Sequence, residues 1–162
     1  MSLVLIRAAI VSIMQAVPDI GVVHAYERYA KNIADLAALY RSAPHQQLRG
    51  WYVGRNKTAE RDRVQNTSTE YTVWKINGFM ALSDENQSEL QMDLLIEALR
   101  DTFRVNDTLN DTVAQCSLPS PGGGSREASL QLLDFGPVMF GAVLCHGVRL
   151  QLNTIRYLTR TV

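Results

Sequence analysis

Residues 69–103 read TEYTVWKINGFMALSDENQSELQMDLLIEALRDTF and join two different hydrophobic patterns. Positions 69–82 are rich in β-branched and aromatic residues, which favours a strand, with Asn77-Gly78 as a candidate bulge or bend. From position 88 onward, apolar residues recur at spacings of three and four, which predicts an amphipathic helix. The helical stripe consists of Met92, Leu95, Ile96, Leu99 and Phe103, widened by Leu94 and Ala98. A long strand followed by a long helix predicts an α+β fold.

The predicted helix carries an acidic stripe. Asn86 followed by Glu89 has the form of a capping box, and acidic residues crowd the first turns, where the helix dipole favours them. Glu89, Asp93 and Glu97 are spaced by four, so their carboxylates should lie along one side. Such a stripe can bind a hard cation or serve acid–base chemistry, but a solvated or subunit-facing surface is its more common role.

Upstream of this segment, helix and strand patterns alternate. Residues 2–17 have apolar residues every three or four positions, which predicts a helix that ends at Pro18-Asp19. Residues 21–26 are a short β-branched run and predict a strand, whereas residues 33–40 predict one or two helical turns. Residues 47–54 predict a further strand because large aromatic and β-branched residues occupy its centre.

Downstream of the helix, strand patterns return. Residues 112–118 and 127–135 predict strands, and Gly136-Pro137 is expected to interrupt the second. Residues 142–157 predict a final strand with apolar residues on one face. That face consists of Leu144, Val148, Leu150 and Leu152. Residues 119–125 hold two prolines and three consecutive glycines, which predicts a hairpin loop.

This order of elements predicts a mixed, mainly antiparallel sheet. An N-terminal helix and one long amphipathic helix should pack on it, and a hairpin arm over about residues 54–68 should protrude from it. The chain has 162 residues, which is the usual length of one domain, and we find no linker. We therefore expect residues 1–162 to form one domain.

The charges cancel over the whole chain but not locally. There are 16 Lys and Arg against 16 Asp and Glu, which argues against coating nucleic acid or acidic membranes through bulk charge. Residues 84–111 contain eight acidic and two basic side chains, whereas residues 49–63 contain five basic and two acidic ones. Residues 141–162 contain three arginines and no acid, and Arg149 and Arg156 lie in the predicted last strand. These blocks are either solvated surfaces or complementary faces that pair neighbouring copies.

The basic block forms most of the predicted arm. The cationic residues of the predicted arm are Arg55, Lys57, Arg61 and Arg63. One interpretation is a solvated loop with local ion pairs to Glu60 and Asp62. The other is an arm that contacts a charged partner, either the acidic helix of a neighbouring subunit or DNA. Fifteen residues without secondary structure are uncommon in a compact domain, and such loops are often functional.

Catalytic and cofactor-binding motifs are weak. The glycine run is followed by neither the lysine nor the helix that a phosphate-binding loop requires. The histidines and cysteines are scattered singly at His24, His45, His146, Cys116 and Cys145. We therefore expect no metal, no cofactor and no enzymatic activity, although a Ser/His/Asp triad built from distant positions stays open.

The N-terminal apolar run is too short for a membrane anchor. Arg7 interrupts it, no basic leader precedes it, and a membrane span needs roughly 20 apolar residues. We expect a cytosolic protein without a membrane partner.

Four features of the chain together point to a family. They are the opening helix at 3–17, the join of the strand at 71–82 to the helix at 88–103, the phrase FRVNDTL at 103–109 and the last strand GVRLQL at 147–152. This order resembles the tail terminator proteins of long-tailed bacteriophages, namely the lambda-type terminator and its relatives among tail-completion proteins. Residues 30–44 are an insertion relative to the leanest members of that family.

The resemblance implies a structural virion protein of the phage tail and neck, assembled in the bacterial cytoplasm. It implies a sixfold homo-oligomeric ring that caps the tail tube, meets the head–tail connector protein and lets DNA pass through its lumen without reading sequence. The arm and the acidic helix are then expected at subunit or tube contacts. The candidate contacts are Arg55, Lys57, Arg61, Arg63, Glu89, Asp93, Glu97, Arg149 and Arg156. A head–tail connector or other tail-completion protein is the alternative, and a small α+β enzyme or ligand-binding domain is the second.

Overall fold

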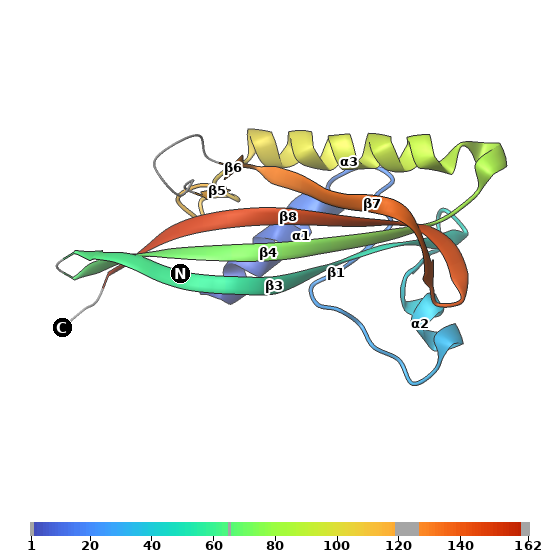
Figure 1. The fold of residues 1–162 in the computed structure, drawn as a ribbon, viewed down its shortest axis with the longest axis horizontal. Coiled ribbons are helices and arrows are strands. Elements are labelled where there is room, and N and C mark those ends of the chain that lie inside the picture. The colour runs from blue at the N-terminus through green and yellow to red at the C-terminus, as the bar shows by residue number, and fades with distance from the viewer. Residues whose placement is uncertain (1, 65, 119–126, 160–162) are drawn as a thin grey trace.

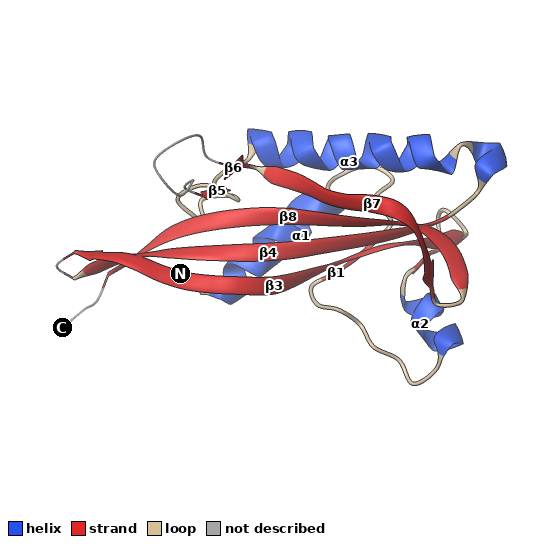
Figure 2. Cartoon of the chain, viewed as in Figure 1, coloured by secondary structure: helices blue, strands red, loops and turns tan. Residues whose placement is uncertain are grey.

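The computed structural model describes residues 2–64, 66–118 and 127–159, with the side chains of residues 62–64 also outside the description. Over these residues the chain forms three α-helices. They lie around one long twisted sheet (Figure 1), and Figure 2 separates helix from strand. The elements are α1 (Leu3–Gln15), β1 (Val22–His24), α2 (Ile33–Leu39), β2 (Arg41–Ser42), β3 (Gln47–Val64), β4 (Thr67–Ala81), the 3₁₀ turn η1 (Asp84–Asn86), α3 (Ser88–Val105), β5 (Ser117–Leu118), β6 (Glu127–Ala128), β7 (Leu130–Phe140) and β8 (Val143–Thr159).

The sheet is mixed and mainly antiparallel, as the sequence predicts. Within the described ranges the strand order is β1-β3-β4-β8-β7, with β2 paired to the start of β3. Only β1 runs parallel to its neighbour, whereas β3, β4, β8 and β7 are joined in antiparallel pairs. The short strands β5 and β6 pair with each other. The predicted α+β class is therefore confirmed.

Helices α1 and α3 pack on the same face of this sheet, which we call the helix face. Two buried indoles, Trp51 and Trp74, lie at its centre, and the indole N–H of Trp51 donates to the carbonyl of Ile20 at 2.8 Å. The stripe predicted for α3 faces this core, since Met92, Leu95, Ile96, Leu99 and Phe103 are all buried. Ser2 caps α1 by accepting from the backbone N–H of Val4 at 3.2 Å. The predicted packing of both helices is confirmed.

The other face of the sheet, the second face, is covered at one end only. Residues around α2 fold over that end and form a separate aromatic cluster around Tyr40, which is fully buried. The rings of Phe79 and Phe140 stack with centroids 3.9 Å apart, and Tyr40 meets Phe140 edge-on at 4.9 Å. Lys75 and Asn77 border the cluster on this face and are only half-buried, and the side-chain amide of Asn77 donates to the hydroxyl of Tyr52 at 2.5 Å. Residues 30–44 therefore contribute to covering one end of the second face.

Among the described residues, most of the polar segment 54–68 is strand and not the structureless loop that its composition suggests. Its first eleven residues continue β3 as far as Val64, and β4 begins at Thr67. β4 is also paired with β8 as far as Thr159, so this end of the sheet has three strands rather than two. Polar side chains replace apolar ones here because the strands extend past both helices, as Figure 1 shows. The glycine-rich loop predicted at 119–125 lies outside the described residues.

The start of α3 differs from the predicted capping box. Gln87 is the N-cap residue, with positive φ and no side-chain cap, and Asn86 belongs to the preceding 3₁₀ turn. Ser88 instead accepts from the backbone N–H of Ser83 at 2.8 Å and so ties the turn to the helix. The stripe is also narrower than predicted, because Leu94 points away from the sheet and is 73% exposed.

Several strand boundaries also differ from expectation. β7 runs through Gly136-Pro137 to Phe140. An edge strand tolerates proline, because the missing backbone N–H can lie on the side that has no neighbouring strand. Residues 112–116 are mostly bends, with a single antiparallel bridge between Gln115 and Ile155 of β8. The strand predicted over 112–118 therefore reduces to this bridge and β5. Along β8, Leu144 is exposed while the rest of its predicted apolar face is buried.

The expected bulge at Asn77-Gly78 is absent from β4. The register between β3 and β4 shifts instead between Arg55 and Lys57 on the partner strand. Gly78 is needed for another reason: a Cβ atom there would lie 2.3 Å from the buried ring of Trp51. The glycine that suggested a bend therefore accommodates a core indole.

Candidate functional site: the charged edges of the sheet

The predicted basic residues of β3 lie at a free edge of the sheet. Residues 47–48 of β3 pair with β2 and residues 50–52 pair with β1, whereas from Val53 onward no described strand pairs with its outer side. Arg55, Lys57 and Arg61 are all exposed along this edge. The guanidinium of Arg61 lies 5.5 Å from the ring centre of Tyr71, which holds the side chain against the sheet. The side chain of Arg63 lies outside the described residues. We call this stretch, residues 53–64, the basic edge.

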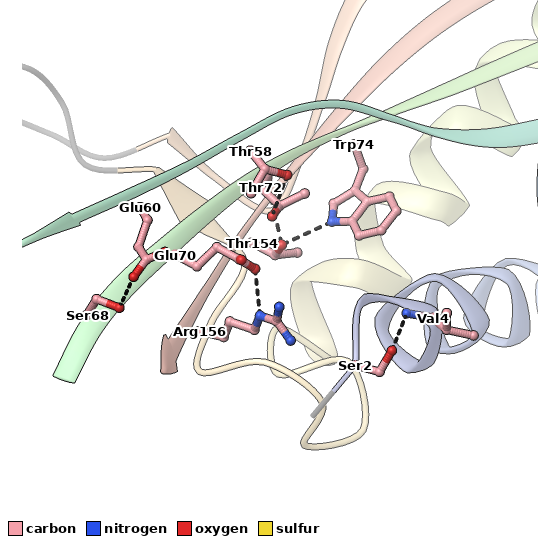
Figure 3. A network of polar contacts seen from close by, with 10 residues as sticks. All are labelled: Ser2, Val4, Thr58, Glu60, Ser68, Glu70, Thr72, Trp74, Thr154 and Arg156. Atoms are coloured by element: carbon pink, nitrogen blue, oxygen red, sulfur yellow. Dashed lines mark hydrogen bonds and ion pairs between the residues drawn. The ribbon is translucent and has the colours of Figure 1, made fainter. Parts of the chain in front are cut away.

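The two arginines predicted on the last strand have partners within the same chain. Arg149 lies 3.5 Å from the carboxylate of Asp134, and both side chains are largely exposed. Arg156 donates from Nε to Oε1 of Glu70 at 2.6 Å, and only 15% and 10% of the two side chains are exposed. Figure 3 shows this pair in a row of polar contacts that also includes Thr72 and Thr154. Arg156 therefore belongs to a structural ion pair within the subunit and is not an exposed contact residue.

The acidic residues of α3 form one exposed surface. Glu89, Asp93 and Glu97 lie on the outer side of the helix, as their spacing predicts. Glu97 pairs with Arg100 one turn later, whereas among the described residues Glu89 and Asp93 have no ion pair. Beside these carboxylates, Leu90 and Leu94 are 57% and 73% exposed. The outer face of α3 is therefore both acidic and apolar.

These two charged surfaces lie at opposite edges of the molecule. α3 packs beside β7, which is the last strand at one end of the sheet order, whereas the basic edge belongs to β3 at the other end. Figure 1 shows α3 along the top and β3 along the bottom. A single copy therefore cannot bring these two surfaces together. Two copies placed side by side in the same orientation can.

A third exposed feature was not predicted from the sequence. The outer side of α1 carries Val4, Leu5, Ala8 and Ser12, with no charged side chain over three turns. Arg7, the one charge in α1, turns toward the protein, where its Nη1 donates to the carbonyl of Ala25 at 2.9 Å and its guanidinium lies 5.6 Å from the ring centre of Trp74. The sequence does indicate a helix with almost no charge. However, its apolar spacing does not show which of the apolar side chains the sheet covers and which stay exposed.

The structure brings together one serine, histidine and aspartate, the combination left open above. Ser42 Oγ lies 2.7 Å from His45 Nδ1, and His45 Nε2 lies 3.3 Å from Asp19 Oδ1. A nucleophile must reach its substrate and needs donors for the oxyanion that forms. Ser42 is only 2% exposed, because the turn between β2 and β3 encloses it. This arrangement fits a connection between that turn and the end of α1 better than a catalytic triad.

Replacement of Ser42 by alanine tests this assignment. We expect it to lower the free energy of unfolding by about 1 kcal/mol, the usual net contribution of one hydrogen bond. Urea unfolding gives that value, and a fluorophosphonate probe reports nucleophilic serines in the unmodified protein. Stoichiometric labelling that disappears in Ser42→Ala would contradict the structural assignment and favour a hydrolase.

A second serine–histidine contact is also internal. Ser88 Oγ lies 2.7 Å from His146 Nε2, and both residues are buried at the start of α3. Among the described residues, no group of three or more His, Cys, Asp or Glu side chains gathers as a metal site would require. Over the same part of the chain, no helix has the length and apolar character needed to cross a bilayer. The candidate interaction surfaces are therefore the basic edge, the outer face of α3 and the outer face of α1.

Comparison with protein-family models yields no match, and comparison with curated proteins also yields none.

Proposed function

We propose that this protein is a structural virion protein of the tail-terminator type. It forms a ring, sixfold by the family resemblance, that caps the tail tube and joins the tail to the head-side connector protein. In this proposal the protein is not an enzyme, it assembles in the cytoplasm of the host bacterium, and it is located in the tail and neck of the virion. The observation that supports the proposal best is the position of acidic and basic surfaces at opposite edges of one sheet.

A subunit with oppositely charged surfaces at its two edges suits a cyclic assembly. A ring is built from heterologous contacts, in which one surface of a subunit meets a different surface of the next. A subunit with acidic α3 at one edge and basic β3 at the other can repeat such a contact around a circle. Charge complementarity of this kind contributes register and specificity more than affinity. It also accounts for a chain whose charges sum to zero while each edge is strongly charged.

Two other functions remain as alternatives. A head–tail connector or another tail-completion protein would use the same self-association, so the partner that the ring binds separates it from a terminator. A small enzyme or ligand-binding domain is supported only by the Ser42–His45–Asp19 contacts, in which the serine is enclosed. In both ring proposals DNA passes through the lumen, and a neutral protein avoids holding it there.

Mass measurement of the purified protein, alone and with isolated tail tubes, tests the proposed function. We expect a closed oligomer, or a monomer that becomes a ring on the tube end, together with binding to tube ends and not to their sides. Binding to purified connector rings in the absence of tubes would favour the connector alternative. A protein that stays monomeric and binds neither partner would contradict the proposal.

A further inference from the structure

A groove of about 310 Å³ lies on the helix face next to the basic edge. It is lined by Leu3, Val4, Arg7, Arg55 and Trp74, and we call it the α1 groove. Val4 is 73% exposed beside it, and Arg55 carries a guanidinium that no acidic side chain of the described chain neutralises. The groove therefore combines an apolar surface with positive charge at one side. No described segment of the same chain fills it.

The outer face of α3 has the complementary composition. Leu90 and Leu94 are four residues apart, so their side chains lie next to each other along the helix axis. Asp93 and Glu97 adjoin them, and we call these four residues the α3 stripe. An amphipathic helix that docks in a groove uses apolar residues with this spacing, and flanking charges select its partner. The α3 stripe thus has the form of a helix that binds a groove.

We infer that the α3 stripe of one copy binds in the α1 groove of the next copy. This inference rests on the proposed function, since it assigns the subunit contact of the ring. Leu90 and Leu94 would cover Leu3 and Val4, while Asp93 and Glu97 would approach Arg55. The α3 stripe is acidic and the α1 groove is basic. The next copy therefore supplies the oppositely charged surface for each of them.

The two surfaces of one copy are placed so that they meet only between copies. Figure 1 shows the N-terminal end of α3 at the right of the molecule and the first turn of α1 further to the left. Each copy would therefore use its stripe on one neighbour and its groove on the other. That is a heterologous contact, which either closes into a ring or continues as a filament.

Disulfide trapping tests this contact directly in the full-length protein. Val4→Cys and Leu94→Cys are prepared as separate variants, and both positions are exposed. The native thiols should not interfere, because both are buried and burial raises the pKa of Cys116 to about 12 and that of Cys145 to about 11. After mild oxidation, we expect a mixture of the two variants to give disulfide-linked dimers and a Val4→Cys/Leu94→Cys double variant to give a ladder of higher multimers.

Matched controls make the result decisive. Met139→Cys on β7 is also highly exposed and replaces Leu94→Cys in a parallel mixture, where we expect at least tenfold less cross-linking to Val4→Cys. Equal cross-linking in both mixtures would overturn the inference. Leu90→Asp with Leu94→Asp should lower the association constant at least tenfold while far-ultraviolet circular dichroism stays unchanged.

Mass measurement on the same samples separates failure of the inference from failure of the proposed function. If the protein assembles but Val4 and Leu94 are not trapped together, the ring proposal stands and this contact is wrong. If the protein is monomeric at every concentration and on tail tubes, the proposed function fails, and the inference fails with it.

Discussion

Reversal of Arg61 and Arg63 to glutamate should weaken self-association at least tenfold while each copy stays folded. Arg61 is exposed on the basic edge and contacts Tyr71, but it contributes no ion pair to its own chain among the described residues. Loss of that contact should therefore cost about 1 kcal/mol or less of stability. At the interface, the two reversals change the charge by four units and place two negative charges opposite the acidic α3 of the next copy. Like charges across an interface cost several kcal/mol in total.

Sedimentation at several salt concentrations measures this effect. Salt screens exposed charges, so the difference between the variant and the unmodified protein should shrink as the ionic strength rises. Lys31→Glu with Arg41→Glu is a matched control, because it makes the same change in net charge at exposed positions away from the basic edge. If the control weakens association as much as the edge variant, total charge and not the basic edge determines assembly. If neither variant changes association, the charge pattern is only a solvated surface.

The long elements of the fold could be predicted because their signals are local. The spacing of Met92, Leu95 and Ile96 predicts both the helix and its buried side, and the structure confirms both. The same spacing does not reveal where the apolar stripe ends, and the prediction that Leu94 widens it is wrong. A leucine at the boundary of a stripe looks the same in sequence whether the sheet or a second copy covers it.

The remaining errors concern tertiary neighbours, which means the helices, strands and side chains that pack against a residue from distant parts of the chain. Residues 54–64 are polar because no helix covers that end of β3, and composition alone does not distinguish an uncovered strand from a loop. Pro137 is tolerated because β7 has a free side, which depends on the strand order. The contact between His45 and Asp19 joins positions 26 residues apart in the chain, so no local pattern could predict it. Among the candidate contact residues, the sequence could not show that Arg156 has a buried partner.

Replacement of Arg156 by alanine should lower the free energy of unfolding by about 2–3 kcal/mol, because it leaves Glu70 without its ion-pair partner. Glu70 is 8% exposed and pairs in register with Arg156 across β4 and β8, so water does not readily replace the lost guanidinium. Urea unfolding measures the loss.

Arg149→Ala is the matched control for this prediction, since its ion pair with Asp134 is 64% and 65% exposed and should contribute less than about 0.5 kcal/mol. A second variant, Glu70→Gln in the Arg156→Ala background, should recover part of the loss, because it removes the unpaired buried charge rather than restoring a contact. Recovery of this kind would assign Arg156 to the stability of the subunit. If Arg156→Ala instead unfolds like the unmodified protein but fails to assemble, the arginine acts between copies, as its place in a basic final strand first suggested, and its pairing with Glu70 contributes little.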